Sequence, residues 1–139
     1  MTPTMIAAIS VFTFFTIVGL FASIAWSLNV PKAFQMMSKA AGFDLQQTAA
    51  SSEQSGKAMR FLLIDFTSQM AGLNLLALLI VWIPFKNGEL WAWAALWYYP
   101  AMFLWHYMHY AKKTGFSKVQ LFYCVLSAAV LLLTFTQFS

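Results

Sequence analysis

Charged residues divide this chain into four long apolar stretches, which cover about residues 5–28, 61–84, 91–110 and 119–138. Each stretch is close to the roughly 20 residues that a helix needs to cross the hydrocarbon of a bilayer. A helix also pairs its own backbone polar groups, which lipid cannot do. The pattern predicts an all-α integral membrane protein. Short connections make neighbouring spans antiparallel, so we expect a single four-helix bundle over residues 1–139.

The composition supports this prediction. Hydrophobic residues make up 61% of the sequence and charged residues only 9%, whereas a soluble domain usually has about 25% charged residues. An ordinary soluble domain is therefore excluded. No basic residue precedes the first stretch, which is longer than the core of a secretory signal, so we expect it to be retained as a span.

The distribution of basic residues predicts the orientation. Cytoplasmic connections of membrane proteins are enriched in Lys and Arg, and seven of the eight basic residues lie in the first and third connections. We therefore expect both termini outside, in the periplasm of a bacterium, and a multi-pass protein of the cytoplasmic (inner) membrane. The basic residues are Lys32, Lys39, Lys57 and Arg60 in the first connection, Lys86 in the second, and Lys112, Lys113 and Lys118 in the third.

The net charge of +4 indicates membrane lipids as partners rather than nucleic acid, because the charge is spread over two short loops beside apolar spans. Small residues also recur at every fourth position of the first span, at Gly19, Ser23 and Ser27. This spacing lets two helix backbones approach closely. Two interpretations stay open: the face packs within the chain, or it binds a partner membrane subunit or a second copy in a homo-oligomer.

The first connection contains a segment of helical pattern over residues 31–42. Phe34 and Met37 lie opposite Lys32 and Lys39, with Pro at the start and Gly at the end, which predicts an interfacial helix. It either lies on the membrane surface as a connection or gates a pocket. Residues 46–57 are rich in Ser, Gln and Ala and are expected to form a polar linker.

Aromatic residues make up 18% of the chain, and five of the six tryptophans lie near predicted span ends. That placement is typical of an anchoring belt in the headgroup layer. In the middle of the third span, Trp97, Tyr98 and Tyr99 precede Pro100. Proline lacks a backbone N–H, so it should kink this helix. A kink with aromatic neighbours can form the wall of a cavity.

Two ionisable residues, Asp65 on the second span and His106 on the third, fall at the same predicted depth. They lie five residues inside Arg60 and six residues inside Lys112, which puts both about 7 to 9 Å from the cytoplasmic helix ends. An ionised carboxylate is costly in lipid, so Asp65 is expected to face inward and to pair with His106. These are the candidate catalytic residues, for proton transfer to a bound molecule.

Other polar side chains lie in the same cytoplasmic third of the four spans. Together they predict a site that binds a lipid or another hydrophobic small molecule, with isomerase-like proton transfer as its chemistry. The candidate ligand-binding residues are Gln69, Tyr99, His109, Tyr110, Tyr123 and Ser27.

Other interpretations fit the same residues. The cluster can be structural and fix helix register by hydrogen bonds, in which case the protein is a non-catalytic accessory or assembly subunit of a membrane complex. Asp65, His106 and His109 could bind a metal, although two imidazoles and one carboxylate are a thin ligand set. The two histidines lie on one helix and cannot take opposite axial positions of a haem, so a haem needs a partner subunit. The sequence does not identify a cofactor.

The second connection is a short polar turn followed by tryptophans. The run Gly88-Glu89-Leu90-Trp91-Ala92-Trp93 resembles a turn of some small uncharacterised bacterial four-span membrane proteins. The resemblance covers this connection and the start of the third span. It implies a bacterial inner-membrane setting and assigns no catalytic residue.

Overall fold

The computed structural model describes residues 1–138, and every regular element in that range is a helix. Three helical segments are long and apolar enough to cross a membrane, which makes this a protein of the multi-pass membrane type. They are α1 (Pro3–Leu28), α4 (Glu53–Ile80) with the π-helical turn η1 (Val81–Phe85), and α7 (Phe116–Thr134) with the 3-10 turn η3 (Phe135–Gln137).

The predicted interfacial helix is present as α2 (Val30–Ala41). Asn29 separates it from α1, and the Asn29 side chain accepts a hydrogen bond from the backbone N–H of Lys32 at 3.2 Å. This N-cap lets a new helix start in a new direction directly after α1 ends. Gly42 ends α2 with φ of 82°, a left-handed conformation that favours glycine.

The predicted polar linker over residues 46–57 is wrong, because most of it is helical. Asp44 caps the short α3 (Leu45–Ala50), and Ser52 caps α4, which begins eight residues before the apolar stretch at 61. An ion pair between Lys57 and Glu53, with 2.6 Å between Nζ and Oε1, lies on this exposed extension. The Ser52 cap and this ion pair are local interactions, and they extend α4 beyond the apolar stretch that hydrophobicity alone predicts.

The third apolar stretch is broken, as Pro100 predicted. It forms α5 (Leu90–Leu96) and α6 (Tyr98–His109), with Trp97 between them. Pro100 lies in the first turn of α6, where a helix has backbone N–H groups without partners and loses nothing to proline. The single continuous helix expected over 91–110 is thus replaced by two short ones, neither of which is long enough to cross a membrane alone.

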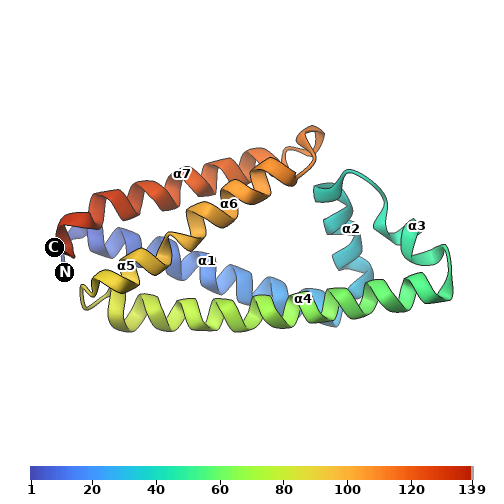
Figure 1. Cartoon of the computed structure of the whole chain (residues 1–139), viewed down its shortest axis with the longest axis horizontal. Coiled ribbons are helices and arrows are strands. Elements are labelled where there is room, and N and C mark those ends of the chain that lie inside the picture. Colours follow the sequence, from blue (N-terminus) through green and yellow to red (C-terminus); the bar gives the residue numbers. More distant parts are fainter. Residues whose placement is uncertain (139) are drawn as a thin grey trace.

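The helices form two antiparallel pairs, α1 with α4 and α6 with α7 (Figure 1). The pairs meet mainly where α1 packs against α7, whereas α4 has few contacts with α6 or α7. Both chain ends lie at the same end of the molecule, and α2 and α3 lie at the opposite end (Figure 1). The arrangement is a pair of hairpins joined along one edge, more open than the compact bundle expected from the short connections.

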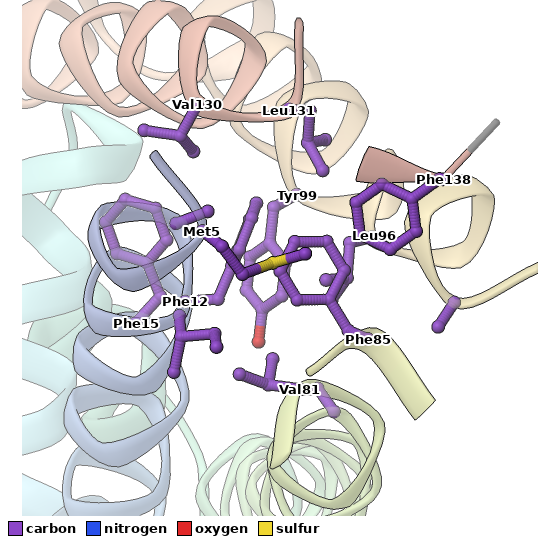
Figure 2. Packing of buried hydrophobic residues seen from close by; sticks show 14 of the residues in the cluster. Met5, Phe12, Phe15, Val81, Phe85, Leu96, Tyr99, Val130, Leu131 and Phe138 are labelled. Atoms are coloured by element: carbon purple, nitrogen blue, oxygen red, sulfur yellow. The ribbon is translucent and has the colours of Figure 1, made fainter. Parts of the chain in front are cut away.

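The main hydrophobic core lies at the end that holds the termini (Figure 2). Its centre is aromatic: the Phe12 ring packs against Phe85 and Tyr99, with ring centroids 6.0 and 5.4 Å apart. Phe138, near the C-terminus, packs against Phe85 at 5.0 Å. Rings in edge and tilted arrangements attract each other more strongly than their buried area alone accounts for. Their packing fills this end of the molecule.

Two tryptophans join helices through their indole N–H groups. Trp82 Nε1 donates to Thr13 Oγ1 on α1 at 3.0 Å, and Trp93 Nε1 donates to the carbonyl of Leu131 on α7 at 2.9 Å. Trp93 is half-buried in the core. It therefore holds α5 to α7 in addition to the anchoring role expected for the belt.

The small-residue face of α1 packs within the chain for two of its three residues. Ser23 is buried, and Gly19 lies so close to Asn74 of α4 that a Cβ on Gly19 would approach Asn74 Oδ1 to 2.5 Å. Ser27 is exposed. A side chain at position 19 would therefore displace the Asn74 amide, which packs against the Gly19 backbone.

Replacing Gly19 by leucine should therefore destabilise the protein. The new side chain must push α4 away, and overpacking of this kind costs about 1 to 3 kcal/mol. Gly72→Leu is the matched control, because Gly72 is likewise a glycine within a long helix, here α4, and a Cβ there meets nothing within 4 Å. Thermal unfolding in detergent, followed by circular dichroism, should show a lower midpoint for Gly19→Leu alone. Equal midpoints for the two variants would contradict this account of α1–α4 packing.

Candidate functional site

A cavity of about 210 Å³ lies between the two helix pairs, toward the middle of the molecule. Residues of α1, α4, α6 and α7 line it, and aromatic rings and methionines form most of its wall. They include Phe15 and Trp26 of α1, Phe66, Met70 and Asn74 of α4, Tyr99, Met102, Phe103, His106 and Tyr110 around α6, and Gln120 and Tyr123 of α7.

A second cavity of about 470 Å³ lies beneath α2. Its wall includes Met36, Met37 and Ala40 of α2 together with Phe116 of α7. The two cavities share a set of lining residues and therefore adjoin, so we treat them as one cleft. The shared residues are Trp26, Phe66, Tyr110 and Gln120.

The cleft is apolar and carries no Lys, Arg, Asp or Glu among the lining residues. Ligand sites in proteins are typically of this kind, with hydrophobic walls and a few placed polar groups. The shape follows from the fold: aromatic packing holds α1 against α6 and α7 near the termini, and α4 does not fill the space further along. A molecule with a long apolar part fits such a wall.

His106 is one of the polar groups in the cleft. Its ring stacks on Tyr110, with the centroids 4.9 Å apart and the planes 16° from parallel. Gln120 of α7 lies beside the imidazole, but the two groups do not meet hydrogen-bond geometry. The Gln120 Oε1 atom is buried and has no hydrogen-bond partner among residues 1–138.

Helix α2 covers the wide end of the cleft. The backbone N–H of Ala111, in the loop after α6, donates to the carbonyl of Ala40 at 2.8 Å. Phe34 on the inner side of α2 is buried together with Leu63 of α4. The helix therefore spans from one pair to the other and contacts both, with Lys32 and Lys39 exposed on its outer surface.

The predicted meeting of Asp65 and His106 is wrong. Asp65 is exposed, and its Oδ2 accepts a hydrogen bond from Gln69 Nε2 at 2.8 Å, one turn along α4. Leu63 and Thr67 are the buried residues of this part of α4, and Asp65 lies about 200° around the helix from either. Asp65, Gln69 and Gly72 share one face of α4, and that face points outward.

The other predicted site residues divide into two groups. Tyr99, Tyr110 and Tyr123 line the smaller cavity, and His109 lines the larger one. Gln69 and Ser27 are exposed and line neither cavity; the Ser27 hydroxyl donates to the carbonyl of Ile24 at 2.8 Å.

The predicted metal ligands are not assembled. His109 Nδ1 lies 2.8 Å from the carbonyl of Trp105, and its ring packs on the Trp105 indole at 4.1 Å, whereas His106 faces Tyr110. Within residues 1–138, no group of three His, Cys, Asp or Glu side chains is placed to hold a metal ion. The candidate chemistry of the cleft is therefore that of His106, Gln120 and tyrosine hydroxyls.

Most residues of the cleft wall were not among the predicted site residues, and three of them show why: Phe66, Asn74 and Gln120. Asn74 and Gln120 are amides inside apolar stretches, which is a signal the sequence does contain. The Asn74 Nδ2 group donates to the carbonyl of Met70 at 2.7 Å, so it is satisfied within α4. Phe66 has no such signal, because it is an apolar residue of an apolar stretch, and it remains 45% exposed, against 69% for Phe61.

Comparisons with protein-family models, with curated proteins and with solved structures each found no match to this chain.

The link between Ala111 and α2 can be tested by Ala111→Pro. Tyr110 has ψ of 147° and Ala111 has φ of −58°, so proline fits the backbone here. It removes the N–H that bonds Ala40 and places a methylene against that carbonyl. Hydrogen exchange of residues 30–41 should become faster than in Ala111→Ser, which keeps the N–H. Equal exchange in both variants would show that this link does not hold α2 in place.

Proposed function

We propose that the protein crosses the membrane four times, with α5 and α6 together forming the third crossing. The position of the termini supports this, because two chain ends at one end of the molecule require an even number of crossings. Helices α5 and α6 contain 7 and 12 residues, which at about 1.5 Å per residue approach the thickness of the hydrocarbon when joined.

The orientation we propose places both termini outside and α2 and the loop after α6 in the cytoplasm. This puts the exposed Lys32, Lys39, Lys112 and Lys113 beside the inner leaflet, where anionic headgroups attract them. We also propose the inner membrane of a bacterium as the setting, on the resemblance of the turn at Gly88 to Trp93.

Single cysteines test this topology. In a Cys124→Ala background, a membrane-impermeant maleimide should label Asn87→Cys in spheroplasts, since Asn87 is exposed in the outer turn. Thr114→Cys, equally exposed at the other end, should be labelled only after permeabilisation. Labelling of Thr114→Cys in sealed spheroplasts would show that the protein has the opposite orientation. The background variant alone should stay unlabelled.

We propose that the cleft binds a lipid or another hydrophobic small molecule that enters from the cytoplasmic leaflet. The observation that carries this proposal is the uncharged cleft itself, which adjoins α2 and holds His106 and Gln120 in an apolar wall. The proton-transfer chemistry expected of an Asp65/His106 pair has no support in this geometry, since the carboxylate faces away.

A second candidate function is that of an accessory subunit of a membrane complex. The observation in its favour is the outward polar face of α4, where Asp65, Gln69 and Gly72 are exposed. Polar groups on a lipid-facing helix can hydrogen-bond to a partner helix. A partner subunit or a second copy of this chain would then cover α4.

Filling the cleft tests the binding proposal. Met102 lines the cleft and Met108, on the same helix, is 54% exposed. Met102→Trp should reduce the lipid that copurifies with the protein by about tenfold, equivalent to about 1.4 kcal/mol of binding free energy. Met108→Trp should leave it unchanged. Mass spectrometry of extracts from both purified variants gives the amounts.

The matched pair separates the two candidate functions. Loss of one lipid species in Met102→Trp alone supports binding in the cleft. If both variants retain the same lipids as the parent, the cleft is not the binding site, and the accessory-subunit function becomes the better one. Both variants must elute as monodisperse protein of the parent's size for the comparison to hold.

A further inference from the structure

Within residues 1–138, Oε1 of the Gln120 carboxamide is a fully buried side-chain acceptor without a hydrogen-bond partner. The buried hydroxyls of Thr16, Ser23 and Thr134 donate to carbonyls of their own helices at 2.7 to 3.0 Å. Gln120 Oε1 is as inaccessible as these atoms but has no partner among residues 1–138. An unpaired buried acceptor costs about 1 to 3 kcal/mol, so native proteins rarely leave one without a reason.

The position of Gln120 shows where a partner would come from. The residue lines both cavities, so it lies where the two meet, and it sits beside His106. An amide rotates readily about its last side-chain torsion and carries a donor and an acceptor. The carbonyl oxygen is buried in this rotamer, and rotation of the amide would turn it toward a ligand group in the cleft.

The partner of Oε1 must donate a hydrogen bond. A lipid phosphate or an ionised fatty acid offers acceptors only. Neither is matched by the lining of the cleft, which contains no Lys or Arg. An unpaired charge in such a site is costly. A hydroxyl group is uncharged and both donates and accepts.

We infer that the ligand is an uncharged lipid alcohol whose hydroxyl donates to Gln120 Oε1 beside His106, with its apolar chain along the aromatic wall of the cleft. This inference rests on the proposed function and specifies its ligand class. Specificity comes from Gln120, because the apolar wall accepts any chain that fits.

Three probes with the same eleven-carbon bromoalkyl chain test this inference: ω-bromoundecanol, its methyl ether and ω-bromoundecanoic acid. Bromine quenches tryptophan fluorescence at short range, and Trp26 lines both cavities, so it reports on the cleft. The signal that reports on the cleft is the part of the fluorescence quenching that is present in the parent protein and absent in Trp26→Phe. We expect the alcohol to bind about fivefold more tightly than the ether, the size of one net hydrogen bond, and the acid to bind most weakly.

Gln120→Leu provides the variant and Gln69→Leu the matched control, since Gln69 lies outside the cleft. In Gln120→Leu the alcohol should bind no better than the ether, and in Gln69→Leu the fivefold preference should persist. The ligand-free Gln120→Leu protein should unfold at or above the parent's temperature, because leucine removes an unpaired acceptor. A lower unfolding temperature would give Gln120 a structural role and overturn the inference.

The outcomes separate this inference from the function on which it rests. Equal quenching by the alcohol and the ether, abolished by Met102→Trp, would retain a lipid-binding cleft and reject recognition of the hydroxyl. Tighter binding of the acid would likewise reject an uncharged ligand. If no probe quenches Trp26, both the proposed function and the ligand class fail.

Discussion

The contact on which the rest of the structure depends is the aromatic packing of α1 against α6 and α7. Phe15 packs against Phe103 and Tyr123, with ring centroids 5.0 and 5.2 Å apart. Lipid tails are as apolar as these side chains, so in a membrane such packing is not driven by removal of apolar surface from water and depends on close contact and ring geometry. Because α4 has few contacts with α6 and α7, these rings and the α1–α7 contact hold the two helix pairs together. The same arrangement leaves the cleft beside them open.

Hydrogen bonds in this protein mostly close within single helices. The buried hydroxyls of Ser23, Thr67 and Ser127 donate back to their own helices, and the Asn74 amide does the same. Between long segments, the indoles of Trp82 and Trp93 supply direct bonds. A membrane penalises unpaired polar groups in its hydrocarbon, and this pattern satisfies that constraint locally. The unpaired amide of Gln120 departs from it, and it does so inside the cleft rather than in the filled core.

The extent to which this structure could be predicted differs between elements. Hydrophobicity located the three long segments, the Pro/Gly pattern located α2, and Pro100 located the break before α6. The rotation of α4 could not be read in the same way. Both faces of this helix are apolar around Asp65, so the sequence does not show which face points inward. The prediction that Asp65 faces inward depended on the free-energy cost of an ionised carboxylate in lipid. That cost falls toward the ends of a membrane span, and Gln69 pairs with the carboxylate on the outward face. The cost argument was therefore too weak to fix the direction of the side chain.

Selectivity in such a cleft must come from its polar groups. In water, an apolar pocket gains binding free energy from every methylene that it buries. In a bilayer, a lipid leaves an equally apolar surrounding when it enters the cleft, so the aromatic wall gains shape complementarity and little else. Any lipid whose chain fits would then exchange with the bulk, and discrimination requires a difference in polar contacts. His106 and Gln120 supply such contacts at the junction of the two cavities, beneath a helix that is tied to Ala111 by one backbone hydrogen bond. A ligand bound as proposed would thus have its polar group beside His106 and Gln120, at the end of the cleft that α2 covers.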